Sequence, residues 1–496
     1  MDINQYYNDI NNLSKKILSI INKQHIEGEE TNLIRIIEDA CYLVDEIVTD
    51  ISLYNKSIKN YNNPLFYQGY FFFNNAIWRT VMTWERIINF LGMFYEIQYF
   101  EQSDKNKISY IYDKLKKNQD FRASNIFGVI SKFISENSYK FALDTRKYND
   151  HDICIHIQEL ENIEKYFSQN RMFKEIGDSY KLSQDKKRIE CDLNVNDFEK
   201  INTQAHKMVY KKIDKYIDDI QKNIDVFMVL IDEITKLYYL NNKTILIQNI
   251  NFKWSFKKRH TEKFIVRNKY FYNNMIDYIG ELYNKSADLK GRHIKRANEI
   301  NMNPALAFTR PPIIKTYNYF SDTAFRLHES IRSLLDSITL FHNQTHPIYP
   351  EVSVLNFMYI TILRCYSCYD KMGKLIFIFF EVDDYNDEID ETPQLLFEKA
   401  ITHAKNDETV NFIEPIKLAS RILLSFEYER LSEIRNNIYH ILSPHVVLSL
   451  ENSSLLFSEF FYICFKNMDM ILKLLLQIEI GVDKMHEVSK YINSSM

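Results

Sequence analysis

The sequence predicts a mainly α-helical protein, and three observations support this prediction. The chain of 496 residues contains only 9 glycines and 9 prolines, so it has few turn formers and favours long helices with short connections. Its apolar residues recur at three- and four-residue steps over long stretches. Landmark residues of the first part return in the last part in the same order, which predicts two copies of one helical domain.

Composition sets limits on the class of protein. Hydrophobic residues make up 46% of the chain, enough for sizeable cores, and a net charge of -4 excludes a global attraction to nucleic acid. The six cysteines are scattered and lack the second pair of a zinc site, so we expect reduced, mostly buried thiols in a cytoplasmic protein. There is no charged-then-apolar leader, and no apolar run reaches the ~18 residues of a membrane helix, so no membrane partner is expected.

The first predicted domain spans residues 1–165. Helical spacing of apolar residues predicts helices over 33–58, 70–97, 108–117 and 126–135. The stretch that follows carries Arg146 and, five positions later, His151.

Residues 166–309 are predicted to form a helical middle segment with a basic patch. A long amphipathic helix from about 197 to 237 comes first, and residues 244–256 alternate with a period of two, which suits a short strand or hairpin. Two basic clusters follow, interleaved with aromatic residues that suit a phosphate backbone and unstacked bases. The alternative is a solvated helix face. The residues predicted to contact RNA are Lys257, Lys258, Arg259, Arg292, Lys295 and Arg296.

The third predicted domain, 310–496, repeats the landmarks of the first. Residues 334–338 resemble 43–47. Without a gap, Arg79, Trp84, Glu85, Arg86 and Glu96 align on Arg364, Tyr369, Asp370, Lys371 and Glu381. Downstream, Arg435 and His440 stand at the place that Arg146 and His151 occupy in the first copy.

Arginine and histidine are the residue types that RNA cleavage by the ribose 2′-hydroxyl can use. That reaction needs a base, an acid and a cation that stabilises the phosphorane. Histidine can perform either proton step, and a guanidinium can hold the phosphate, so no metal or cofactor is required. Residues five apart on a helix are separated by about 140° and roughly 7.5 Å, yet both reach a groove that the helix borders. Two copies facing each other would supply both acid and base.

The string Arg435-Asn436-x-x-x-His440 in an all-helical domain resembles the signature of the HEPN (higher eukaryotes and prokaryotes nucleotide-binding) superfamily. The resemblance covers about 1–165 and 310–496. It implies two four- to five-helix bundles paired as an intramolecular pseudo-dimer, and a metal-independent endoribonuclease acting on single-stranded or loop RNA. It further implies a toxin or anti-phage defence effector, with an antitoxin or other defence protein as partner.

The resemblance also implies roles for individual residues. Arg435 would bind the scissile phosphate, His440 would act as general acid or base, and Asn436 would orient the backbone or the substrate. Arg146 and His151 would mirror them. At 147 a lysine replaces the usual small polar residue, so the first site is either altered or part of a shared composite site.

Several alternatives stay open at this point. Asp370 and Glu85 each offer a carboxylate that either supports the motif arginine or forms a structural salt bridge. Arg435 and His440 could also be an ordinary helix-surface pair. The runner-up function is a non-catalytic RNA- or nucleotide-binding protein on the same scaffold, and the third is a structural adaptor, in which His151 and His440 would lie far apart. The sequence leaves open which RNA is cut, what activates the protein and whether two chains associate.

Overall fold

All elements of the described structure are helical, which confirms the predicted all-α class. The computed structural model describes residues 3–23, 32–59, 68–97, 107–134, 136, 138, 198–241, 258–301, 311–344, 353–380, 397–407, 413–440, 443–446, 448 and 450–495. The predicted strand or hairpin at 244–256 lies outside these residues. Among the described helices, none combines the length and the apolar character needed to cross a membrane.

The described helices between residues 3 and 241, called the first half here, form a bundle around α2 and α3. The long helix α9 packs against α1, α2, α3 and α6 and so completes this bundle. Its helices are α1 (Ile3–Lys23), α2 (Ile34–Ile58), α3 (Gly69–Phe94), α4 (Lys107–Leu115), α5 (Gln119–Ala123), α6 (Asn125–Ile134) and α9 (Phe198–Asn241).

The described helices between residues 258 and 495, called the second half here, form a bundle around α14 and α15. The helix α12 packs against α14 and α20, and α10 packs against α20. Its helices are α10 (Lys258–Arg267), α11 (Lys269–Asn273), α12 (Met275–Asn301), α14 (Pro311–Asn343), α15 (Val354–Phe379), α17 (Phe397–Asn406), α18 (Glu414–Leu423), α19 (Phe426–His440), the 3-10 turn η2 (Pro444–Val446) and α20 (Leu450–Ser495).

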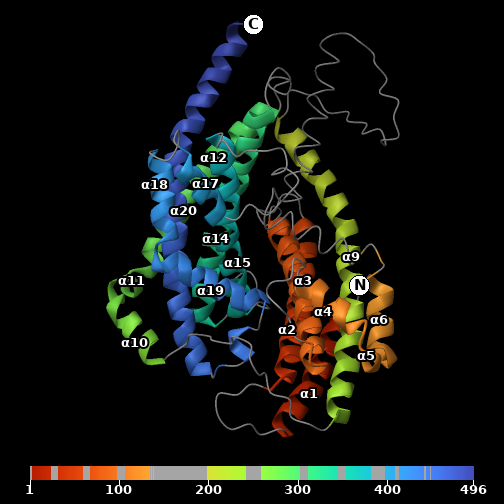
Figure 1. Ribbon diagram of the computed structural model, residues 1–496. Coiled ribbons are helices and arrows are strands. Elements are labelled where there is room, and N and C mark those ends of the chain that lie inside the picture. The colour runs from red at the N-terminus through yellow and green to blue at the C-terminus, as the bar shows by residue number, and fades with distance from the viewer. Residues whose placement is uncertain are drawn as a thin grey trace, which may run out of the picture.

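Figure 1 shows the two halves side by side, the first in red to yellow and the second in green to blue. Of the predicted middle segment, 166–309, the structure describes α9, which packs against the first bundle, and α10 to α12, which pack with the second. Helix–helix packing decides this division, because each of these amphipathic helices buries its apolar stripe against one bundle only.

The helices α3 and α15 are buried around nearly their whole circumference. Each nonetheless carries charged residues, and a charge in a protein interior needs a partner that replaces its hydration. On α3, Arg86 donates from Nε to Asp39 of α2 at 2.7 Å. On α15, Lys371 donates from Nζ to Asp322 of α14. The aligned cations thus bind carboxylates at corresponding places in the two halves.

A second pair of contacts relates the halves in the same way. The indole Nε1 of Trp84 donates to Oδ1 of Asn223 on α9 at 2.8 Å. The hydroxyl of Tyr369, which aligns with Trp84, donates to Oδ1 of Asn467 on α20 at 2.7 Å. The helix α20 therefore occupies in the second half the place of α9 in the first.

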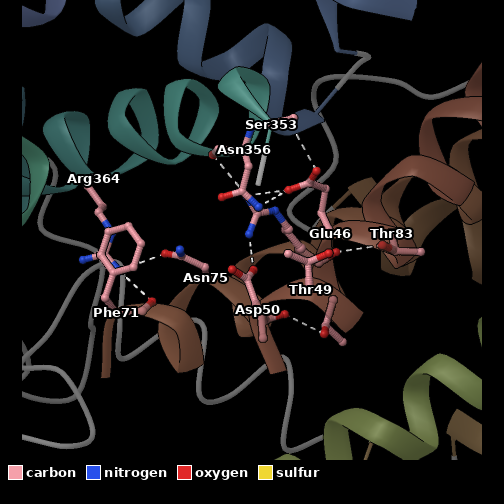
Figure 2. Close-up of polar contacts among 12 residues, drawn as sticks. Glu46, Thr49, Asp50, Phe71, Asn75, Thr83, Ser353, Asn356 and Arg364 are labelled. Carbon is pink, nitrogen blue, oxygen red and sulfur yellow. Dashed lines mark hydrogen bonds and ion pairs between the residues drawn. The ribbon is translucent and has the colours of Figure 1, made fainter. Parts of the chain in front are cut away.

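The interface between the halves is reciprocal. Nη2 of Arg79 on α3 donates to the carbonyl of Asn356 on α15 at 3.1 Å. Nη2 of Arg364 on α15 donates to the carbonyl of Phe71 on α3 at 3.0 Å, as Figure 2 shows. Within each half, the arginine follows the residue contacted from the other half by the same number of positions. The two hydrogen bonds thus join α3 and α15 at matching places of their aligned segments.

Carboxylates of the first half strengthen this interface. Arg79 pairs with Asp50 and lies 3.5 Å from Glu46, both on α2. Glu46 also accepts hydrogen bonds from Asn356 and from Oγ of Ser353 at the start of α15 (Figure 2). The buried guanidinium of Arg79 thus contacts two carboxylates of its own half and a backbone carbonyl of the opposite half.

The described cysteines are buried free thiols, as predicted: Cys41, Cys365, Cys368 and Cys464. Burial raises the pKa of the Cys368 thiol to about 12, so this group is un-ionised at neutral pH. The other two cysteines of the chain lie outside the described residues.

Candidate functional site

Local sequence explains why the second motif lies on a helix. Oγ of Ser425 accepts a hydrogen bond from the backbone N–H of Tyr428 at 3.3 Å, which caps the start of α19. Glu427 and Glu429 place negative charge in its first turn, where the helix dipole favours it. The helix ends at His440. Its backbone is therefore defined at the motif histidine, while the side chain of His440 lies outside the described part.

Arg435 is half-buried and held by its neighbours. Its Nη1 donates to Oδ1 of Asn436 at 2.9 Å. Its guanidinium lies 5.1 Å from the ring centre of Tyr366 and 5.0 Å from that of Tyr439. Asn436, predicted to orient backbone or substrate, thus orients the arginine itself.

Asp370 and Arg435 line the same small cavity, of about 10 Å³. This space admits roughly one water molecule. The wall also includes Trp78 of α3 and Leu363 of α15, which are aligned residues of the two copies. The cavity therefore lies at the junction of the two halves. The buried carboxylate of Glu85 holds the place on α3 that Asp370 holds on α15.

Residues of the first half bind the end of α19 that carries the motif histidine. From α3, Nη1 of Arg86 donates to the carbonyl of Tyr439 at 2.8 Å, and Nη2 donates to the carbonyl of Ile438. These are two of the last carbonyls of the helix, which have no intrahelical donor. Asp39 of α2 accepts from Nε of Arg86 and from the backbone N–H of Ser443 at 3.0 Å. The chain is thus fixed on both sides of His440.

The sequence alignment pairs Arg86 with Lys371, but no pattern in the sequence pointed to a role for Arg86 or for Asp39. The only sequence signal was the gapless alignment of α3 with α15. A contact between residues so far apart along the chain leaves no periodic pattern that could have revealed it.

A second histidine lies just beyond α19. Nδ1 of His445 is 2.9 Å from the hydroxyl of Tyr359, and its ring is 4.4 Å from that of Tyr42 of the first half. Burial lowers the pKa of His445, so the ring is neutral at physiological pH. It joins the halves as an uncharged group.

Arg146 and His151, the predicted first motif, lie outside the described residues. The chain nevertheless approaches both motifs from matching positions. Nδ2 of Asn223 donates to the carbonyl of Ser138 at 3.2 Å, and Nδ2 of Asn467 donates to the carbonyl of Glu427 at 2.8 Å. Ser138 precedes the first motif by as many residues as Glu427 precedes the second.

The first predicted basic cluster is partly described. Nζ of Lys258 pairs with Glu451 on α20, and Arg259 is exposed. Lys257 lies outside the described residues. An exposed pair such as Lys258 with Glu451 contributes little stability, so this lysine can exchange its carboxylate for a phosphate.

In the second predicted cluster, the described cation Arg292 is already paired. Arg292 donates from Nε and Nη2 to the two carboxylate oxygens of Glu479 on α20, each at 3.0 Å. His293 lies 2.8 Å from the same carboxylate. The side chains of Lys295 and Arg296 lie outside the described part. Arg292 therefore fastens α12 to α20.

No group of three histidine, cysteine or acidic side chains among the described residues is arranged to hold a metal ion. No protein-family model, no curated protein and no solved structure matches this chain.

Proposed function

We propose that this protein is an endoribonuclease that cleaves single-stranded or loop RNA without a metal ion, through the Arg435–His440 motif. One observation supports this most. The end of α19 that carries the motif is held by Arg86 of the opposite half, so the motif lies at the junction of the two halves. Such a junction is where two motifs can serve one phosphodiester.

Arg435 fits the role of phosphate clamp. Its guanidinium is half-buried and fixed by Asn436 and two tyrosine rings, so little rotational freedom is lost on binding. The adjoining cavity of about 10 Å³ is too small for a nucleotide. The phosphate must therefore meet the guanidinium from the solvent side, where flexible single-stranded RNA can adapt to it.

His440 and the first motif would divide the proton transfers. A base removes the 2′-hydroxyl proton, O2′ forms a bond to phosphorus, and the bond from phosphorus to O5′ breaks. An acid protonates the departing O5′. The products are a 2′,3′-cyclic phosphate and a 5′-hydroxyl. Under this proposal His440 performs one transfer and His151 the other, with Arg146 as a second cation.

The test is an RNA-cleavage assay with chelator present, followed by end-group analysis. We expect cyclic phosphate ends from the wild-type chain and a loss of rate of about 10² to 10⁴ in His440→Ala, the usual contribution of a general acid or base. Arg421→Ala, which removes an exposed arginine of α18, should cleave normally. Undiminished cleavage by a chain carrying both Arg435→Ala and His440→Ala would reject this site.

RNA that binds and stays intact in every condition would favour the runner-up, a non-catalytic RNA- or nucleotide-binding protein on this scaffold. A role as toxin or defence effector, with an antitoxin or defence protein as partner, rests on the HEPN resemblance. It predicts growth arrest on expression of the wild-type chain and none with His440→Ala.

A further inference from the structure

The helices α10 and α11 stand outside the two sets of matching helices and cover one face of α20. Oγ1 of Thr261 donates to Glu459 at 3.1 Å, and the hydroxyl of Tyr272 donates to the carbonyl of Ser458 at 2.7 Å. The ring of Phe271 packs 5.0 Å from that of Phe465. The helices α10 and α11 thus pack closely on α20, at the outer side of the second half in Figure 1.

A groove of about 400 Å³ lies where α11 meets α12 and α20. This volume is in the range of ligand-binding clefts. It is far larger than the cavity beside Arg435. Its walls combine aromatic rings with charged side chains. It therefore differs from the purely apolar grooves that bind amphipathic helices.

The charges of this groove leave cations available. Two of its carboxylates are already paired on their own helices, Glu281 with Lys285 at 2.6 Å and Asp469 with Lys473 at 2.7 Å. Among the described residues, neither Arg267 nor Lys466 lies within ion-pair distance of a carboxylate. Of the five lysine and arginine residues of α10 and α11, Arg267 lines the groove itself.

The rings of this groove are placed for stacking. Tyr270 is 74% exposed, which is unusual for a large aromatic side chain, and its ring lies 6.2 Å from that of Tyr278. On the opposite wall, Nζ of Lys466 lies 5.6 Å from the ring of Tyr462 and 5.8 Å from the ring of Phe465. The exposed ring of Tyr270 can stack on a flat base, and Arg267 and Lys466, which have no carboxylate partner among the described residues, can bind an anionic phosphate.

We infer that this groove binds a single-stranded segment of RNA, with a base stacked on Tyr270 and phosphates held by Arg267 and Lys466. The inference rests on the proposed function for its choice of RNA, and it adds a second contact that would anchor the substrate away from the cleavage motif. A duplex fits the arrangement poorly, because its bases are stacked on each other and cannot reach the rings.

Binding can be measured apart from cleavage in the full-length His440→Ala chain, with fluorescein-labelled dodecauridylate as the probe and anisotropy as the readout. In this background we expect Tyr270→Ala to weaken binding by about tenfold, the typical effect of losing one stacked base. Arg267→Ala together with Lys466→Ala should weaken binding and flatten the slope of log K against log salt by up to about 1.4, since each single-strand phosphate contact contributes about 0.7.

The matched controls are Tyr239→Ala and Lys211→Ala on α9, which remove an exposed ring and an exposed cation of the first half. Both should bind the probe as the parent does. Thermal melts of every variant would show that the bundles remain folded. Unchanged affinity of the groove variants, or tighter binding of a duplex than of the single strand, would overturn the groove assignment.

The two proposals fail in different ways. If the groove variants lose affinity while no RNA is ever cut by the wild-type chain, the groove stands and the nuclease does not. If the wild-type chain cuts RNA while the groove variants bind and cross-link to 4-thiouridine RNA as the parent does, the nuclease stands and the groove does not.

Discussion

Arg86 shows how a single buried side chain can join the two halves at the candidate site. It has no exposed surface and uses three nitrogens, one on a carboxylate of its own half and two on carbonyls of α19. A lysine at this position would keep the positive charge near Asp39 but could not also donate hydrogen bonds to both carbonyls of α19. Arg86 is therefore a positioning residue for the end of α19.

The variant Arg86→Lys should lower the free energy of unfolding by about 1–3 kcal/mol, because a buried carbonyl loses its donor. If the nuclease proposal is correct, kcat for RNA cleavage should fall while KM changes little, since the histidine moves but the RNA-binding surface does not. Urea unfolding and steady-state kinetics measure the two effects. Arg35→Lys, in a partly exposed pair with Glu38, is the control and should change neither. A normal kcat in Arg86→Lys would contradict the positioning role.

His206 provides a pH-dependent test of packing in the first half. Its Nδ1 is 2.6 Å from the hydroxyl of Tyr70, and burial lowers its pKa from 6.5 to about 4. The imidazole of His206 thus binds a proton less readily in the folded state than in the unfolded state. The stability that the neutral ring contributes is complete above pH 6.5 and is lost as pH falls toward 4.

The pKa difference of His206 between the folded and unfolded states corresponds to about 3 kcal/mol of stability at most. In His206→Phe, the free energy of unfolding should therefore fall less steeply between pH 6.5 and 4.5 than in the wild type. The difference between the two slopes should correspond to at most one proton bound on unfolding. Denaturant titrations at several pH values measure the slope. A wild-type slope in His206→Phe would show that this ring does not titrate as its burial requires.

At the scale of the element, close approach of helices distinguishes one glycine from another. A Cβ atom at Gly373 of α15 would lie 3.1 Å from Cα of Phe397 and 3.2 Å from Cβ of Ala400, both on α17. At Gly128 of α6, nothing lies within 4 Å. Both glycines are inside helices, where alanine is the better helix former.

The variant Gly373→Ala should therefore destabilise the protein by about 1–3 kcal/mol, because the backbone of α17 must move away. Gly128→Ala should stabilise it by about 0.4–1 kcal/mol through the reduced freedom of the unfolded chain. Thermal and urea unfolding of the two variants check both signs. Equal effects would mean that α15 and α17 are not packed as closely as the structure shows.

The helix α19 illustrates a second element-scale property. Asn467 of α20 holds it at one end through the carbonyl of Glu427, and Arg86 of α3 holds it at the other. The helix thus bridges its own bundle and the opposite half. Its position depends on the interface as much as on its own sequence.

At the scale of the whole molecule, reciprocal contacts predict that the halves stay together without a covalent link. Arg79 and Arg364 are buried and each donates to a carbonyl of the other half. Separation would break these hydrogen bonds and would expose apolar side chains that the interface buries, such as Phe71 and Phe357, whose rings lie 6.2 Å apart. Exposing buried apolar surface to water is unfavourable.

A protease site inserted between α9 and α10 should test this prediction. After cleavage we expect the two fragments to co-elute in size-exclusion chromatography at micromolar concentration, and to separate only in denaturant. Arg364→Ala in the nicked protein should weaken their association, whereas Arg421→Ala, an exposed residue of the second half, should not. Separation of the wild-type fragments would show that the linker holds the halves together.

The sequence by itself determined the helices and much of their correspondence. Few glycines and prolines and a three- to four-residue apolar period predicted the all-α class, because a helix must bury one stripe wherever it lies. The gapless alignment of 79–96 with 364–381 identified α3 and α15 as counterparts, because buried charges at matching places of both helices constrain the sequence. The motif on α19 was also visible as a string, although its chemistry stays a prediction.

Only the tertiary structure decided which helices share a bundle and what each charge contacts. The match of 43–47 with 334–338 suggested one register between α2 and α14, but the ion pairs relate Asp39 to Asp322 instead. The hydrogen bonds from Arg86 to the end of α19, and the shared cavity of Trp78, Asp370 and Arg435, join segments hundreds of residues apart. Local periodicity cannot encode such contacts, because they depend on how finished helices pack against one another.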